Sequence, residues 1–279
     1  MSGTEVAGPA LDDEYDNRGH IPGGDLFPAL WAERAAALRA RLAAAGRWRE
    51  GLAYGPYRRE RFDLALPEGA PAGLMVFVHG GYWRAFDRGD WSHLAAGAVA
   101  RGWAVALVGY PLCPKVRVSR ITAAVAAAIA RAAEEVPGPI ALAGHSAGGH
   151  LVARMLMADV PLPEPVRARI GAVMPVSPVA DLRPLRRTAI NADLRLDAAE
   201  AVRESPALGQ PVRAVPLPVV VGAAERPAFL AQARWLAEAW PGGRLIAPLG
   251  RHHFDVIELF ERPDDPLLAG LLREAAGAG

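Results

Sequence analysis

The residues with the clearest chemical potential form the run Gly144-His145-Ser146-Ala147-Gly148. The run follows an apolar stretch, residues 139–143, and opens a helix-like stretch, which is the setting of a G-x-S-x-G nucleophile elbow. In such an elbow a sharp strand-to-helix turn exposes one serine oxygen for attack on a carbonyl carbon. Because strand and helix pass close together, the positions two residues either side must be minimal, hence Gly144 and Gly148. The pattern therefore predicts that Ser146 is a nucleophile.

A serine hydroxyl is a weak nucleophile near neutral pH, so Ser146 requires a histidine that accepts its proton. In hydrolases with this elbow the chain order is nucleophile, acid, histidine, which places the base downstream. His150 lies one turn into the following helix and is poorly placed to reach back. His252 and His253 both follow a strand expected at 244–247 and a Pro-Gly turn. We choose His253, because a helix is expected to begin directly after it, and expect His252 to face outward or support the loop.

A carboxylate must hold the histidine in the useful tautomer. The first carboxylate after the strand expected at 217–222 is Glu225, and Pro227 is expected to start the helix that follows. Asp181, which follows the strand expected at 170–176, is the alternative acid. A carboxylate at a strand end is also commonly a helix cap or a solvated surface group. The chain-order rule favours Glu225 and leaves Asp181 open.

The negative charge that develops on the substrate oxygen requires N–H donors that are already in place. A loop that could supply them, His79-Gly80-Gly81-Tyr82-Trp83, comes directly after an apolar strand expected at 74–78. The expected donors of this oxyanion hole are the amides of Gly81, Tyr82 and Ala147. The side chains of Tyr82 and Trp83 are candidates to line the substrate pocket, with ordinary core packing as the alternative. We interpret His79 as a structural hydrogen-bonding residue rather than a base.

The elements that must position these residues alternate along the chain. Apolar runs such as residues 74–78 are apolar on both faces, which favours a mostly parallel sheet covered by helices on both faces. The fold class is therefore α/β, which we expect as a single domain over residues 1–279. An irregular arm is expected at about 1–25, and an insertion over the active-site edge at 181–211. Strands are expected at 62–66, 74–78, 104–108, 140–143, 170–176, 219–222 and 245–247, and helices near 31–47, 91–101, 121–136, 147–158, 227–240 and 254–260.

Composition narrows the class of partner. The chain has 279 residues, of which 52% are hydrophobic, and this is ample for a buried core. Its formal net charge is +1 with the two signs interleaved, which disfavours nucleic-acid binding. The most apolar long segment, residues 121–133, is shorter than the roughly 20 residues of a membrane span, so no transmembrane helix and no membrane partner are expected. We expect a small-molecule ester or amide substrate and keep a homo-oligomer open.

The sequence contains no recognisable targeting signal and no cofactor motif. The start of the chain is acidic and lacks the basic and apolar regions of a secretory signal, which favours a cytoplasmic location. The single cysteine, Cys113, excludes an internal disulfide. There is no His-rich metal motif, and we expect neither a metal nor an organic cofactor.

Taken together, these motifs resemble the kynurenine formamidases (arylformamidases), a branch of the α/β-hydrolases related to the hormone-sensitive-lipase-like esterases. HGGYW at 79–83 is similar to that family's H-G-G-x-W, and GHSAGGHL at 144–151 is similar to its elbow. The similarity continues through YPLCP at 110–114, GAAERPAF at 222–229 and HFDVIE at 253–258. The resemblance implies the α/β-hydrolase fold and a triad of Ser146, Glu225 and His253. The family usually has Asp where this chain has Glu225, and an acid where it has His252.

The resemblance also implies a reaction, the hydrolysis of an arylformamide such as N-formylkynurenine. Ser146 attacks the carbonyl, His253 accepts its proton and passes it to the leaving group, and water then releases the acyl-enzyme. One alternative is a carboxylesterase of short acyl esters. The other is an inactive hydrolase fold that only binds a small molecule, which the complete triad disfavours. Pocket shape decides between formamide and ester, and the sequence does not show it.

Overall fold

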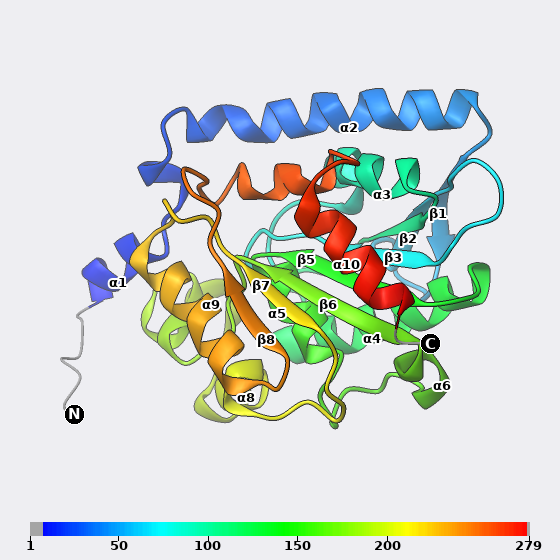
Figure 1. The fold of residues 1–279 in the computed structure, drawn as a ribbon. Coiled ribbons are helices and arrows are strands. Elements are labelled where there is room, and N and C mark those ends of the chain that lie inside the picture. The colour runs from blue at the N-terminus through cyan, green and yellow to red at the C-terminus, as the bar shows by residue number, and fades with distance from the viewer. Residues whose placement is uncertain (1–7, 278–279) are drawn as a thin grey trace.

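A computed structural model describes residues 8–277, in which eight strands form one sheet with helices on both faces (Figure 1). β2 runs opposite to the other seven strands, and every pairing from β4 to β8 is parallel. The mostly parallel sheet that the apolar runs predicted is therefore confirmed. Across the sheet the strands are β1 (Trp48–Ala53), β2 (Arg61–Ala65), β4 (Ala104–Val108), β3 (Leu74–Val78), β5 (Ile140–His145), β6 (Ile170–Val176), β7 (Leu217–Val220) and β8 (Gly243–Ile246).

The central strand β3 shows why both of its faces are apolar. All five of its residues are buried, and successive side chains enter opposite layers of the core. Leu74, Val76 and Val78 pack into one layer, whereas Met75 and Phe77 pack into the other. Burial on both sides explains the continuous apolar run in the sequence.

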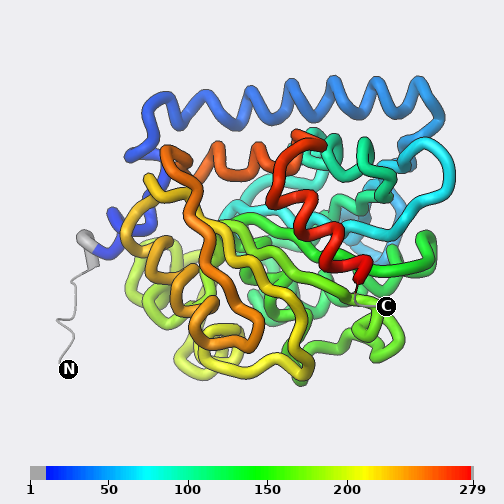
Figure 2. The backbone as a smooth tube through the Cα atoms, viewed as in Figure 1, coloured from blue at the N-terminus to red at the C-terminus, as the bar shows by residue number. Residues whose placement is uncertain are grey.

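Each layer is covered by its own set of helices. One layer contains buried side chains from α4 (Val118–Glu135), α5 (Ala147–Arg154) and α9 (Pro227–Ala239). The other contains side chains from α2 (Phe27–Ala44), η3 (Arg88–Ala95), α3 (Ala96–Ala100), η6 (Val256–Phe260) and α10 (Pro266–Ala276). The long helix α2 packs against η3 on the outside of this second layer (Figure 2). No helix within residues 8–277 combines the length and the apolar character that crossing a bilayer requires.

Several elements differ from the sequence-based expectation. β1 was not expected, because this edge strand is half exposed and carries few apolar side chains. Residues 91–101 form the end of η3 and then α3 rather than one α-helix, and residues 254–260 end in the 3-10 helix η6. α10 was not expected either. The irregular arm expected at 1–25 instead contains α1 (Gly8–Glu14), η1 (Arg18–His20) and η2 (Gly24–Leu26), and its residues 1–7 lie outside the described part of the chain.

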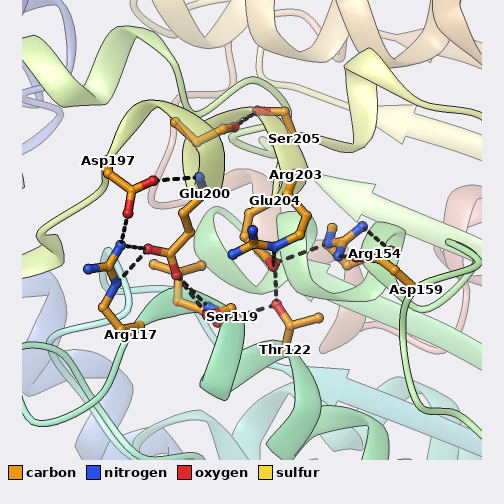
Figure 3. A network of polar contacts seen from close by, with 12 residues as sticks. Arg117, Ser119, Thr122, Arg154, Asp159, Asp197, Glu200, Arg203, Glu204 and Ser205 are labelled. Atoms are coloured by element: carbon orange, nitrogen blue, oxygen red, sulfur yellow. Dashed lines mark hydrogen bonds and ion pairs between the residues drawn. The ribbon is translucent and has the colours of Figure 1, made fainter.

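The insertion expected at 181–211 is present as a set of short helices after β6. They are η4 (Pro184–Arg187), α7 (Asn191–Leu194), α8 (Ala198–Arg203) and η5 (Pro206–Leu208), and α6 (Glu164–Ala168) lies before β6. A network of buried polar contacts ties the insertion to the domain (Figure 3). Glu204 accepts hydrogen bonds from Thr122 of α4, at 2.7 Å, and from Arg154 of α5, at 3.1 Å. Glu200 of α8 accepts hydrogen bonds from Ser119 and Arg117. The insertion is thereby fixed to the helix that begins at the elbow.

Candidate active site

Ser146 lies at a strained turn between β5 and α5. Its φ of 55° is in the left-handed region that non-glycine residues rarely adopt. Its amide donates to the carbonyl of Val176, at 2.8 Å, which helps to hold the turn. A Cβ atom on Gly148 would lie 1.9 Å from the carbonyl oxygen of Val78, and one on Gly144 would lie 2.3 Å from that of Gly148. The close approach of the main chain therefore requires glycine at both positions.

His253 and Glu225 form a buried pair. Nδ1 of His253 lies 2.7 Å from Oε2 of Glu225, and His253 lines the same cavity as Ser146. The other carboxylate oxygen, Oε1, accepts hydrogen bonds from the hydroxyl of Ser177, at 2.5 Å, and the amide of Gly222, at 2.7 Å. These contacts fix the carboxylate, and an anionic partner at Nδ1 leaves Nε2 as the nitrogen that can accept a proton.

Asp181, the alternative acid, has different partners. Its carboxylate accepts hydrogen bonds from Arg183, the shortest at 2.7 Å, and lies 3.5 Å from the hydroxyl of Ser205. The carboxylate that the structure brings to His253 is that of Glu225.

His145 has a position that the sequence reasoning did not identify. Its Nε2 lies 2.9 Å from the carbonyl oxygen of His253, and the two rings lie 4.5 Å apart. Burial lowers the pKa of His145 well below its usual value, so the ring is neutral and Nε2 carries the donated proton. His145 thus holds the main chain of the proposed base, and the only sequence signal for this contact is its place beside Ser146.

The two other downstream histidines are structural. Nε2 of His150 lies 2.6 Å from the carbonyl oxygen of Glu204. Nδ1 of His252 accepts hydrogen bonds from the amides of Phe254 and Asp255, both at 3.2 Å. His252 therefore supports the loop that carries His253.

The loop after β3 lies against the elbow. A Cβ atom on Gly80 would lie only 3.1 Å from Cβ of Ser146. Gly81, Tyr82 and Trp83 all have positive φ, at 106°, 48° and 55°. Among residues 8–277, no hydrogen bond to another protein group is found for the amides of Gly81, Tyr82 or Ala147. These three N–H groups are therefore free to bind a substrate oxygen.

His79 stabilises this loop. Its Nδ1 lies 2.7 Å from the carbonyl oxygen of Gly80, and its ring stacks on Tyr110 with the centroids 4.2 Å apart. Burial lowers the pKa of His79 to about 4, so the ring is neutral near pH 7. This environment agrees with a structural residue and not with a base.

A cavity of about 530 Å³ opens beside Ser146 and His253. Tyr82 lies on its wall, and Ala189 and Ile190 reach it from the insertion. Trp83 is fully buried in the core, edge-on to the ring of His150 at 5.1 Å, and is not among the residues of the wall. The wall also carries a group of aromatic side chains, Tyr15, Trp31, Phe86, Trp91 and Phe254. Charged residues line it as well, namely Asp12, Asp16, Arg18 and Arg84.

Two further features of the described residues bear on the chemistry. Within residues 8–277 there is no set of three or more His, Cys, Asp or Glu side chains arranged to hold a metal ion. Burial raises the pKa of the Cys113 thiol to about 11, so it is not a thiolate near pH 7.

Comparison with known proteins identifies the family. Residues 75–240 match a family described as alpha/beta hydrolase fold, which covers more than half of the chain. The chain belongs to the α/β-hydrolase fold family. The predicted fold class is therefore confirmed.

Several proteins to which this chain is similar carry the names of hydrolases. The kynurenine formamidase of Danio rerio is 33% identical over 159 residues, which are 55% of this chain and 53% of that relative. The chain thus matches about half the length of this curated relative. A solved structure from Silicibacter sp. TM1040, provisionally assigned as a thioesterase, is 52% identical with a TM-score of 0.91, over 94% of this chain and 98% of that one. Esterase B of Lactobacillus rhamnosis HN001 has a TM-score of 0.65 at 18% identity, over 90% of this chain and 96% of that one, and shares the fold.

Proposed function

We propose that the protein is a serine hydrolase that cleaves arylformamides of the N-formylkynurenine type. The observation that carries this proposal is the contact of 2.7 Å between His253 and Glu225 beside the cavity that also holds Ser146. A histidine paired with a buried carboxylate and facing the same space as an elbow serine is the arrangement that makes a hydroxyl nucleophilic.

The reaction proceeds by acyl transfer. Oγ of Ser146 attacks the formyl carbon while Nε2 of His253 accepts the hydroxyl proton, and Glu225 stabilises the imidazolium that results. The amides of Gly81, Tyr82 and Ala147 hold the oxyanion. His253 then gives its proton to the aniline nitrogen as the C–N bond breaks. A water molecule, deprotonated by His253, attacks the formyl-enzyme and releases formate.

The choice of an arylformamide is supported by the cavity and by one relative. An arylformamide combines a very small acyl group with a large flat leaving group, and the aromatic side chains of the wall suit such a ring. The relative from Danio rerio is named a kynurenine formamidase.

A second candidate is the hydrolysis of short acyl esters or thioesters by the same residues. The observation that favours thioesters is the 52% identity to the Silicibacter protein, and the general esterase fold agrees with oxygen esters. The third alternative is an inactive fold that only binds a small molecule. The relatives reported above are named for hydrolytic activities and give this alternative no support.

Parallel turnover measurements separate these substrates. kcat/KM is measured for N-formylkynurenine, p-nitrophenyl acetate and phenyl thioacetate, with Ser146→Ala as the blank. The proposal expects N-formylkynurenine to be cleaved with a kcat/KM at least comparable to that of the activated ester, although its leaving group is far poorer. Negligible cleavage of the formamide beside rapid cleavage of the ester or thioester rejects the arylformamidase assignment and supports the second candidate.

A further inference from the structure

The N-terminal segment forms one wall of the active-site cavity. Tyr15, Asn17 and Arg18 are among the residues that line it, together with Ser146 and His253. In Figures 1 and 2 this segment lies beside the end of α9 that faces the loops at the carboxyl ends of the strands. The site therefore depends on residues about 130 positions before the elbow.

Asn17 is the polar side chain of this wall without a protein partner. The residue is 6% exposed, and its carboxamide makes no hydrogen bond with any other residue of the described range 8–277. The charged side chains nearby all have protein partners. The carboxylates of Asp12 and Asp16 accept hydrogen bonds from the amides of Ala189 and Gly19. The two arginines form ion pairs, Arg18 with Asp25 and Arg84 with Asp193. Asn17 lines the cavity, so a ligand that displaces water from the cavity must itself bind this amide or leave it unpaired at a cost in free energy.

The main chain around Asn17 is held in place by Tyr15. The carbonyl of Tyr15 accepts a hydrogen bond from the hydroxyl of Tyr82, at 2.7 Å, and its own hydroxyl accepts one from Gln232, at 2.8 Å. Its ring packs on Phe229 at 5.8 Å, and Phe229 packs on His253 at 4.4 Å. Tyr15 thus connects the N-terminal segment directly to Tyr82 of the loop at 79–83 and, through Phe229, to His253.

Ion pairs hold the segment from outside. Arg226 donates to Asp13, at 2.5 Å, and to Glu14, at 3.1 Å, just before α9 begins. The carbonyl of Asn17 also accepts a hydrogen bond from the amide of His20, at 3.2 Å. With its backbone fixed and its amide unpaired, Asn17 is pre-organised for binding, which lowers the entropy cost of recognition.

We propose that Asn17 is a specificity-determining residue whose amide NH₂ hydrogen-bonds a carbonyl group carried by the aryl leaving group of the substrate. The proposal rests on the proposed function, because it takes the leaving group to be an aromatic ring between the aromatic walls. It defines the substrate class further: aryl formamides, or aryl esters, with a carbonyl substituent are favoured over unsubstituted ones. An amide side chain supplies two donors for such an oxygen.

The test compares substrate pairs that differ only in that carbonyl. The pairs are 2-formamidoacetophenone with formanilide, and 2-acetylphenyl acetate with phenyl acetate. In Asn17→Leu, which keeps the volume and removes the amide, the ratio of kcat/KM within a pair is expected to fall about tenfold, the size of one buried hydrogen bond. Asn17→Asp, which keeps an acceptor and loses the donors, is expected to lower the ratio as well. Gln210→Leu, an amide-to-leucine change at an exposed site outside the cavity, is the matched control and keeps the wild-type ratio.

The outcomes separate this inference from the proposed function. If formanilides are not cleaved but the esters are, the arylformamidase proposal fails while the ester pair still tests Asn17. If neither pair is cleaved, the dissociation constants of 2-aminoacetophenone and aniline supply the same ratio. An unchanged ratio in Asn17→Leu, or an equal loss on both members of a pair, overturns the role of Asn17.

Discussion

Glu225→Gln should abolish most of the activity and leave the fold intact. The amide of Gly222 is a fixed donor that points at Oε1, so the glutamine must keep its carbonyl oxygen there. The glutamine NH₂ group then occupies the position of Oε2, 2.7 Å from Nδ1 of His253. Two donors cannot face each other, so His253 must adopt the tautomer that carries its proton on Nε2. In that tautomer the ring cannot accept the proton of Ser146.

The size of the effect follows from that tautomer. An acid-to-amide change that traps the histidine in the wrong tautomer lowers kcat by about 10⁴-fold, which is about 5 kcal/mol in the barrier. The folded state loses little, because every buried group keeps a hydrogen-bond partner, and a neutral replacement bond is within about 1 kcal/mol. Activity and stability are therefore expected to separate in this variant.

Two quantities are measured on the same sample of each protein: kcat for p-nitrophenyl acetate and the midpoint temperature of thermal unfolding. The matched control is Asp181→Asn, which alters a buried carboxylate that binds Arg183 and not His253. We expect the control to retain kcat within severalfold. If Asp181→Asn abolishes turnover while Glu225→Gln leaves it almost unchanged, the acid has been assigned to the wrong residue.

Three further predictions concern the scaffold. Gly148→Ala places a Cβ against the main chain of β3 and should lower the free energy of unfolding, measured in urea, by more than about 2 kcal/mol. The control is Gly270→Ala in α10, where a Cβ meets nothing within 3.8 Å and no destabilisation is expected. Equal urea midpoints for the two variants would contradict this prediction. Glu204→Ala removes one of the two carboxylates bound to the guanidinium of Arg154, which is 1% exposed, and leaves only Asp159. The free energy of unfolding should fall by about 3 kcal/mol. A loss below about 1 kcal/mol would show that the buried network contributes little to stability. Burial, with Arg34 and Arg39 nearby, lowers the pKa of His93 from 6.5 to about 3. As the pH falls below about 6.5, His93 is therefore protonated in the unfolded chain but not in the folded one, and the free energy of unfolding decreases. His93→Gln should reduce the slope of unfolding free energy against pH between 6 and 4 by about 1.4 kcal/mol per unit, and an unchanged slope refutes the assignment.

The parts of the site that could be predicted from sequence are those fixed by local geometry. The glycines around Ser146 are required by main-chain contacts within one turn and the adjacent strand, so the G-x-S-x-G pattern carries its own explanation. The same holds for the loop at 79–83, which directly follows a buried strand. Apolar runs gave the parallel strands, because burial on both faces leaves a continuous signal.

Other features depend on contacts that no local pattern encodes. Glu225 and Asp181 both follow parallel strands at one edge of the sheet, and only the paths of the two loops bring Glu225 to His253. Tyr82 and Trp83 are neighbours with positive φ, yet one lines the cavity and the other is buried in the core. Asn17 enters the site from the start of the chain, and this long-range packing leaves no periodic signal.

The most direct test of the account is covalent labelling of the serine. The central claim is that His253 makes the hydroxyl of Ser146 reactive. Intact-protein and peptide mass spectrometry after exposure to a fluorophosphonate should show one adduct, located on Ser146, absent in Ser146→Ala and formed at least about 10³-fold more slowly in His253→Ala. Labelling of a different residue, or a rate on Ser146 that does not change when His253 is removed, would contradict the account.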